Sequence, residues 1–167
     1  MTLKNIPLGK KCPKAHRLIN KIGLRPQARN TTAFKVLKGK YARLKAERGV
    51  NFNSLKEAGY SIQMMLDLGM PIPEIIIGHL AKKGGIQNLV SEVTKLHNSN
   101  DHHYKKLNFK TLVSQGISLK RIYEAKAQIG LLLWEGFTKQ ELVEAGYEEK
   151  RVDSVIRFIN ERKSKKQ

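Results

Sequence analysis

A glycine that returns every ten residues constrains this chain more than any other feature. Three consecutive units, GVNFNSLKEA, GYSIQMMLDL and GMPIPEIIIG, begin at Gly49, Gly59 and Gly69. Four more, GISLKRIYEA, KAQIGLLLWE, GFTKQELVEA and GYEEKRVDSV, run from Gly116 to residue 155, with Lys126 in place of one glycine. Each unit has room for about two helical turns, which are too short to be stable alone. We therefore expect the units to pack on one another.

Two positions are apolar in all seven units. The second position holds Val50, Tyr60, Met70, Ile117, Ala127, Phe137 and Tyr147. The seventh holds Leu55, Met65, Ile75, Ile122, Leu132, Leu142 and Val152. The pattern predicts one short helix per unit, closed by the next glycine in a left-handed conformation, with the second residue packed back over the preceding helix. The predicted N-caps are Asn51, Ser61, Ser118 and Thr138.

The remaining patterns are helical as well. Where Lys126 replaces glycine, we expect two units to fuse into one helix over residues 119–135. An amphipathic helix with Ile86, Leu89, Val90, Val93 and Leu96 on one face should start after Gly84 and Gly85, followed by a polar loop at 98–103. Sustained strand alternation is absent. The fold class is therefore all-α: short helix-turn-helix repeats stacked into a compact helical domain, with a basic N-terminal arm and helix.

Two segments, LKEAGYS at residues 55–61 and EGFTKQELVEAGY at residues 135–147, resemble a known type of repeat. They are similar to the short "AGF-S/T-x-x-E-L" helical repeats of proteins from large DNA viruses and some bacteria. The resemblance covers about 70 residues. It implies a packing motif with a structural or interaction role, and it implies no catalytic residue.

Positive charge is concentrated at the N-terminus. The chain has 32 Lys and Arg against 14 Asp and Glu, a net charge of +18. Residues 1–48 hold fourteen basic residues and a single acid, Glu47, and so carry thirteen of these net charges. This excess predicts a negatively charged partner, which could be nucleic acid, an anionic membrane or an acidic protein. Nucleic acid is the partner predicted first.

The basic region divides into two parts. Residues 1–30 contain three prolines and should form an extended arm with one short helix near 14–22. Residues 31–48 should form a helix capped at Asn30 or Thr31, with Phe34, Leu37, Tyr41 and Leu44 as its apolar stripe and Gly49 at its end. The other predicted segments are a first repeat block at 49–78, a connecting helix and loop at 79–110, a second block at 111–163 and a basic tail at 164–167.

The function predicted first is a non-enzymatic, nucleic-acid-associated protein that binds the phosphate backbone of DNA or RNA. Six to ten phosphate contacts would make affinity fall roughly 10³ to 10⁵ fold between 50 and 200 mM salt. The candidate binding residues are Lys10, Lys11, Lys14, Arg17, Lys21, Arg25, Arg29, Lys35, Lys38, Lys40, Arg43, Lys45, Arg48, Arg162, Lys163, Lys165 and Lys166.

Two alternatives remain open. One is a structural component of a larger assembly, such as a minor virion protein, whose basic arm contacts neighbouring subunits. The other is a transcription regulator that uses helix-turn-helix pairs at 61–80 and 138–159. The second helices of these pairs begin with Glu74 or with Glu148 and Glu149, and acids there would repel phosphates.

Patterns for catalysis or cofactor binding are weak. His97, Asp101, His102 and His103 are expected in a solvated loop rather than a metal site, and Cys12 with His16 makes at most half a zinc site. We therefore expect no enzyme activity, metal, cofactor or small-molecule substrate. Trp134 lies in the apolar phrase LLLWEG and is expected in the core, which leaves few aromatic side chains to stack on bases.

The sequence also bears on location. It has no run of roughly 18 apolar residues and no secretory signal pattern. We expect no membrane span and a location inside the cell, in cytoplasm, nucleoid or nucleus, or in a virion.

Overall fold

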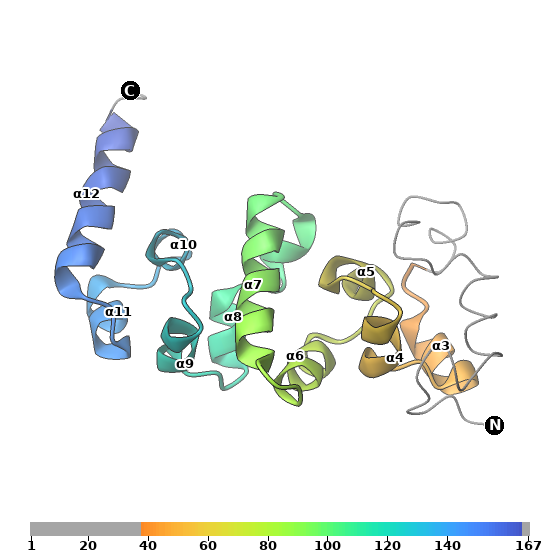
Figure 1. The fold of residues 1–167 in the computed structure, drawn as a ribbon. Helices are drawn as coiled ribbons and strands as arrows, with labels where there is room; N and C mark the ends of the chain where they lie inside the picture. The colour runs from red at the N-terminus through yellow and green to blue at the C-terminus, as the bar shows by residue number, and fades with distance from the viewer. Residues whose placement is uncertain (1–37, 165–167) are drawn as a thin grey trace. The chain divides into compact units, whose positions relative to one another are not determined.

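The computed structural model describes residues 38–164, and over this range the chain is entirely helical (Figure 1). It contains ten α-helices and one 3₁₀ helix, η2, with no β-strand among these residues. The side chain of Lys163 is not described. The all-α prediction is confirmed for this part of the chain.

The chain divides into two compact units at residues 78 and 79. The first includes α3 (Tyr41–Arg48), α4 (Phe52–Glu57), α5 (Ile62–Asp67) and most of α6 (Ile72–Leu80). The second includes α7 (Gly85–Asn98), η2 (His102–Lys105), α8 (Phe109–Ser114), α9 (Leu119–Glu124), α10 (Ile129–Trp134), α11 (Lys139–Ala145) and α12 (Glu149–Ser164). The predicted first block of ten-residue units therefore falls in one unit, and the second block falls in the other.

The short helices end in one recurring turn. The N–H of Gly59 donates to the carbonyl of Lys56 at 3.0 Å, and the N–H of Tyr60 donates to that of Leu55 at 2.9 Å. These bonds reach back three and five residues and close the helix around one left-handed residue. Glycines at this place all have positive φ: Gly49, Gly59, Gly69, Gly116, Gly136 and Gly146.

The beginnings of these helices match the predicted caps. The side chains of Asn51, Ser61, Ser118 and Thr138 each accept a hydrogen bond from the backbone N–H three residues later, which confirms them as N-caps. All seven predicted seventh-position residues are 0% exposed, and the seven second-position residues are at most 8% exposed. The two apolar positions thus form much of the core in each unit.

The predicted helix over residues 119–135 is wrong. The structure has α9 and α10 as separate helices, because Lys126 takes a left-handed φ of 62°. Its N–H donates to Tyr123 at 2.7 Å and the N–H of Ala127 donates to Ile122 at 3.3 Å, as in the glycine turns. A side chain in this conformation costs roughly 1–2 kcal/mol relative to glycine. The turn keeps the two helices apart, and the residue that follows it, Ala127, is buried at 5% exposed.

The predicted helix over residues 31–48 also differs from the structure. Within the described residues, α3 begins only at Tyr41, after a turn in which Gly39 has a φ of 75°. The N–H of Gly39 donates to the backbone carbonyl of Asp67 at 2.9 Å, and the N–H of Tyr41 donates to that of Leu68 at 2.7 Å. These bonds to the end of α5 hold the chain out of helical conformation. Tyr41 and Leu44 are buried as predicted, and residues 30–37 lie outside the described range.

Between the two predicted blocks, α7 runs as expected, with Leu89, Val90, Val93 and Leu96 buried. The sequence prediction missed α8. Its N-cap is Asn108, whose side chain accepts from the N–H of Thr111 at 2.8 Å. Leu107 and Leu112 are both 0% exposed, so the residues before Gly116 form another unit of the same local design.

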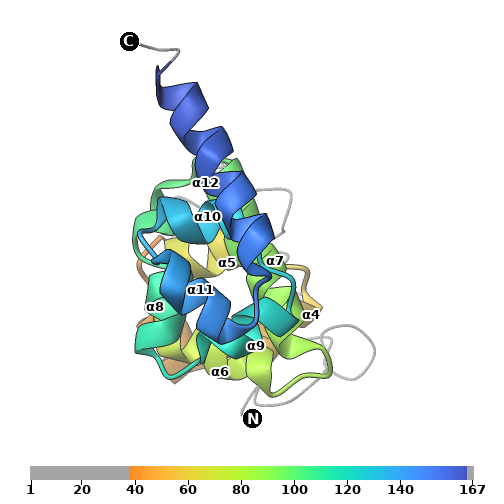
Figure 2. The same cartoon turned by 90° about the vertical axis from the view of Figure 1, so that its left-hand side faces the viewer.

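The C-terminal helix, α12, packs on α10 and α11, and α9 packs on α11 and α7. The second half of α12 extends past these neighbours (Figure 2). Val152 is fully buried, whereas Phe158 is 52% exposed. The apolar side of this helix is therefore only partly covered within the described residues.

Candidate nucleic-acid interface

Only some of the predicted binding residues lie in the part of the chain that the structure describes. Described residues in the set are Lys38, Lys40, Arg43, Lys45, Arg48 and Arg162. Those outside the described residues are Lys10, Lys11, Lys14, Arg17, Lys21, Arg25, Arg29, Lys35, Lys165 and Lys166, and the side chain of Lys163. The N-terminal arm and its short helix also lie outside them. Most of the described candidate residues therefore lie in α3 and in the turn before it.

Helix α3 is anchored by its apolar side and by Glu74 of α6. The Tyr41 hydroxyl donates to the Glu74 carboxylate, and Lys45 pairs with the same carboxylate at 2.8 Å. Burial raises the pKa of Tyr41, and the hydrogen bond to Glu74 raises it further. The phenol therefore stays protonated and keeps donating at neutral pH. This contact fixes α3 against α6 inside the first unit.

The cations of α3 and the preceding turn differ in their pairing. Besides Lys45, Arg43 pairs with Glu47 at 2.7 Å and Lys38 approaches Asp67 at 3.9 Å. Lys40 and Arg48 are exposed, and no ion pair joins them to a carboxylate of the described residues. These two side chains can contact a phosphate without first leaving a carboxylate.

One basic side chain at the end of α12 contacts a residue of the same helix. The Arg162 guanidinium lies over the ring of Phe158, 4.5 Å from its centroid. Such a cation–π contact stabilises an exposed helix end by about 0.5–1 kcal/mol. Arg162 therefore has a structural partner as well as an exposed charge.

The segments predicted as helix-turn-helix pairs correspond to α5 with α6 and to α11 with α12. In the second pair, Lys139 of α11 bonds to Glu149 and Asp153 of α12, each at 2.8 Å. The hydrogen bond to Asp153 raises the pKa of Lys139, and the bond to Glu149 adds to this effect. The acidic start of α12 is thereby tied to its neighbour.

The expectation that Trp134 is buried is wrong, because its side chain is 69% exposed. Its ring meets that of His97 edge-on at 4.9 Å and lies 5.9 Å from that of Tyr104. Leu132 takes the fully buried position of α10 instead, two residues earlier on the helix. With Phe158 and Tyr123, which is 38% exposed, the described surface has more accessible aromatic rings than the sequence suggested.

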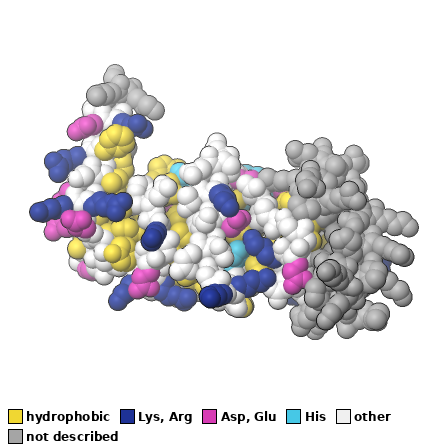
Figure 3. Space-filling view, in the orientation of Figure 1, with side chains coloured by type: hydrophobic (Ala, Val, Ile, Leu, Met, Phe, Trp, Pro, Cys, Tyr) yellow, Lys and Arg dark blue, Asp and Glu magenta, His cyan; other side chains and the backbone are white. Residues whose placement is uncertain are grey.

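Charges on the described surface are mixed. In the face shown in Figure 3, Lys and Arg side chains are interspersed with Asp and Glu side chains. Such a surface favours several separate cationic positions over one continuous basic patch.

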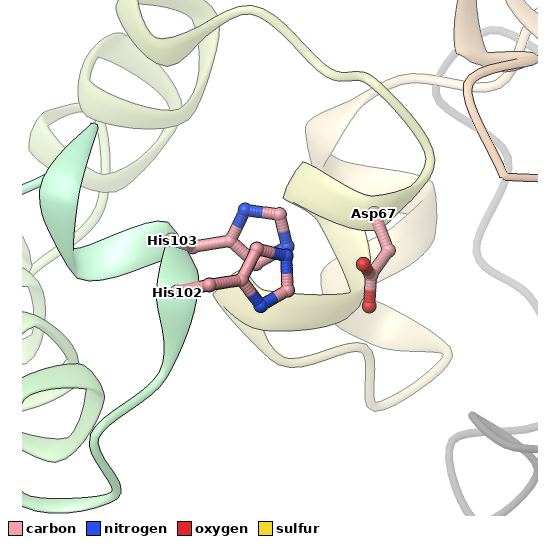
Figure 4. Close-up of side chains that lie close together, drawn as sticks. All are labelled: Asp67, His102 and His103. Carbon is pink, nitrogen blue, oxygen red and sulfur yellow. The ribbon is translucent and has the colours of Figure 1, made fainter.

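The loop at 98–103 is only partly solvated, which corrects the prediction. Asp101 caps η2 by accepting from the N–H of His103 at 2.9 Å, and His103 is 5% exposed. The rings of His102 and His103 stand side by side, with centroids 4.0 Å apart (Figure 4). Asp67, also labelled in Figure 4, belongs to the other unit. The expected absence of a metal stays a prediction.

A groove that the sequence prediction missed lies in the second unit. It has a volume of about 620 Å³ and lies between the turn that joins α9 to α10 and the first half of α12. Lys126 and Arg151 line it, together with Tyr123 and Tyr147. The one signal for it in the sequence is Lys126 in place of a glycine, the feature from which the sequence predicts a fused helix.

Comparisons with known proteins give no assignment: no family model matches the chain, and no match was found among curated proteins or solved structures. None of the described helices is long and apolar enough to cross a membrane. The class that the fold defines is an all-helical protein.

Proposed function

We propose that this protein is a non-enzymatic, nucleic-acid-associated protein that binds the phosphate backbone through residues 1–48. The observation that carries the proposal is the charge of this segment, which holds thirteen of the chain's eighteen net positive charges. Phosphate neutralisation by Lys and Arg releases condensed counterions, so an excess of this size gives affinity with little dependence on base sequence.

The geometry of α3 supports this proposal. Tyr41 and Leu44 face the core of the first unit, and the charged side chains of the helix lie on the exposed side. Lys40 and Arg48 should contribute most, since Arg43 and Lys45 are held by Glu47 and Glu74. A paired cation gains less from a phosphate because it must first give up its carboxylate.

The contacts of α12 favour this function over a helix-turn-helix regulator. The N-terminal residues of a recognition helix normally contact base edges next to phosphates. In α12 this end carries Glu149 and Asp153, both bonded to Lys139. We infer that the α11–α12 pair serves as scaffold.

A second candidate function is a structural role in a larger assembly. The observation that favours it is the apolar side of α12, which the described residues cover only in part: Phe158 is 52% exposed, and Val155, Ile156 and Ile159 are each partly exposed. Partly covered apolar surface of this kind can take part in protein contacts.

The test compares two double variants of the full chain with the same charge change. Lys40→Gln with Arg48→Gln removes the two cations that have no described carboxylate partner, and Arg43→Gln with Lys45→Gln removes the two paired ones. Binding to duplex DNA, to RNA and to polyglutamate is measured over a salt series. We expect the first double variant to reduce the slope of log K against log salt by about two and the second by less.

The outcomes separate the functions. Absence of nucleic-acid binding by the full chain at low salt would refute the proposed function and leave the assembly role as the leading one. Equal losses in the two double variants would refute the contribution assigned to Lys40 and Arg48. Equal affinity for polyglutamate and nucleic acid would show that the binding is to polyanions in general.

A further inference from the structure

The groove between the α9–α10 turn and α12 has the size and lining of a ligand site. Its volume of about 620 Å³ falls within the range of about 300–1,000 Å³ found for small-molecule sites. Ala127, Ile129 and Val155 supply apolar surface, and Gln128 supplies an amide. All lining residues belong to the second unit, so the groove is complete within one compact body.

Lys126 is the least expected residue of the groove. It holds a φ of 62° at a turn where the neighbouring units have glycine. The turn keeps its two hydrogen bonds, from the N–H of Lys126 to the carbonyl of Tyr123 and from the N–H of Ala127 to that of Ile122. Glycine would adopt this conformation without strain, whereas lysine does not. Strained residues of this kind gather at functional sites. Lys126 thus combines a strained backbone with a place in the groove lining, which draws attention to its ammonium group as a ligand contact.

The charge of the groove is positive. Lys126 and Arg151 are both exposed, and neither forms an ion pair with a carboxylate among the described residues. Glu124 is the single acid in the lining. By contrast, Lys139 in the same unit is bonded to two carboxylates. Two available cations beside one acid favour a ligand with negative charge.

Two tyrosines supply flat surface beside these cations. The rings of Tyr123 and Tyr147 meet edge-on at 4.7 Å, and the Tyr147 hydroxyl donates to the carbonyl of Ala127 at 2.9 Å. Burial raises the pKa of Tyr147 to about 12, so this bond persists at neutral pH. Tyr147 is therefore fixed in place, and Tyr123, at 38% exposed, is accessible to a ligand.

We propose that this groove binds one nucleotide unit of a single-stranded nucleic acid. The base stacks on Tyr123, and its phosphate is bound by Lys126 and Arg151. A planar ring joined to an anion is the chemistry that an exposed tyrosine beside two cations recognises, since a base stacks on an aromatic side chain whatever its identity. The inference rests on the proposed function and adds to it a single-strand site far in sequence from the basic N-terminal region.

The test uses the full chain and three probes: a ten-nucleotide oligothymidylate, thymidine monophosphate and a DNA duplex. The variants are Lys126→Gly, Tyr123→Leu and Arg151→Gln, with Lys150→Gln as the control. Lys150 is an exposed cation next to Arg151 and does not line the groove. Lys126→Gly should also raise the melting temperature, because glycine relieves the strained φ, so misfolding is not expected to explain its loss of binding.

We expect Lys126→Gly and Tyr123→Leu each to weaken oligothymidylate binding about fivefold or more, and Arg151→Gln to lower its salt slope by about one. Duplex binding should change less than twofold in these variants, and Lys150→Gln should match the wild type with all probes. Oligothymidylate binding that is equal in Lys126→Gly, Tyr123→Leu and Lys150→Gln would overturn the inference.

The monophosphate serves two purposes. It tests the groove separately from the proposed function, and it distinguishes binding of a nucleic-acid strand from binding of a free nucleotide. Its binding is followed by NMR shifts of groove amides. Monophosphate shifts at Lys126 and Gln128, with no binding of duplex DNA or of RNA at low salt, would support the groove site while refuting the function of residues 1–48. Duplex binding without single-strand or monophosphate binding would refute the groove site alone. Monophosphate binding that exceeds oligothymidylate binding would overturn the assignment to a strand.

Discussion

Glu135, at the end of α10, accepts a hydrogen bond of 2.9 Å from the backbone N–H of Lys110 in the first turn of α8, 25 residues away in sequence. The same carboxylate accepts from the N–H of Phe109 at 3.1 Å and from the Tyr104 hydroxyl. Backbone N–H groups in a first helical turn have no partner inside their own helix. One side chain therefore completes the start of α8 and connects η2, α8 and α10.

The first prediction concerns this contact. Replacing Glu135 by Ala should lower the free energy of unfolding by about 1–2 kcal/mol, because it removes a charged acceptor from three donors. Glu161→Ala, on the exposed end of α12, is the control and should change stability by less than about 0.5 kcal/mol. Urea unfolding measures both, and hydrogen exchange should show faster opening of the α8 amides in Glu135→Ala. Equal stability of the two variants would contradict the role of Glu135.

A second prediction contrasts two glycines inside helices. A Cβ on Gly78 would lie 2.3 Å from the Phe52 ring, whereas one on Gly130 would meet nothing closer than 3.9 Å. Gly130→Ala should stabilise the protein by about 0.5–1 kcal/mol through helix propensity. Gly78→Ala should destabilise it by about 1 kcal/mol or more, since the buried ring has to move. Thermal unfolding of the two variants checks this, and a stabilised Gly78→Ala would show that Phe52 is not packed as described.

The third prediction concerns acid. The N–H of Thr138 donates to the Glu141 carboxylate at 2.7 Å and lowers its pKa, and the Thr138 hydroxyl lowers it further. A carboxyl with a lowered folded-state pKa stabilises the fold above its ordinary value of 4.5, and this contribution is lost as pH falls through the lowered value. Glu141→Gln should therefore be less stable than the wild type at neutral pH, with a gap that closes in acid. Urea unfolding measured from about pH 7 to about pH 3 tests this prediction. A difference in unfolding free energy that stays constant over this range would contradict it.

The fourth prediction uses the only tryptophan in the chain. Because Trp134 is 69% exposed, its emission in the folded protein should lie close to that of the unfolded chain and be quenched readily by acrylamide. Leu132→Ala, at a fully buried position on the same helix, should cost about 2–5 kcal/mol, while Trp134→Ala should cost far less. A blue-shifted, poorly quenched emission would restore the interpretation that Trp134 belongs to the core.

Several features could be predicted because they depend on neighbours within five residues. Ser118 caps α9 through the N–H of Arg121, and Gly59 ends α4 through bonds reaching three and five residues back. The full burial of Leu55 and Leu142 follows from their place in the unit, since one face of each short helix must face the core. For the candidate interface, the sequence indicates which residues carry charge, and α3 shows which of them have a carboxylate partner.

Other features required contacts that no local pattern records. The start of α3 at Tyr41 depends on bonds from residues 39 and 41 to the end of α5, and the exposure of Trp134 depends on which face of α10 meets its neighbours. The sequence by itself determined the all-helical class, the caps, the glycine turns and the burial of the second and seventh positions of the units. Only the tertiary structure decided that Lys126 takes a left-handed turn at a groove and that Glu135 caps a helix 25 residues away. The physical reason is that a short helix gains most of its stability from packing, and packing partners can be distant in sequence.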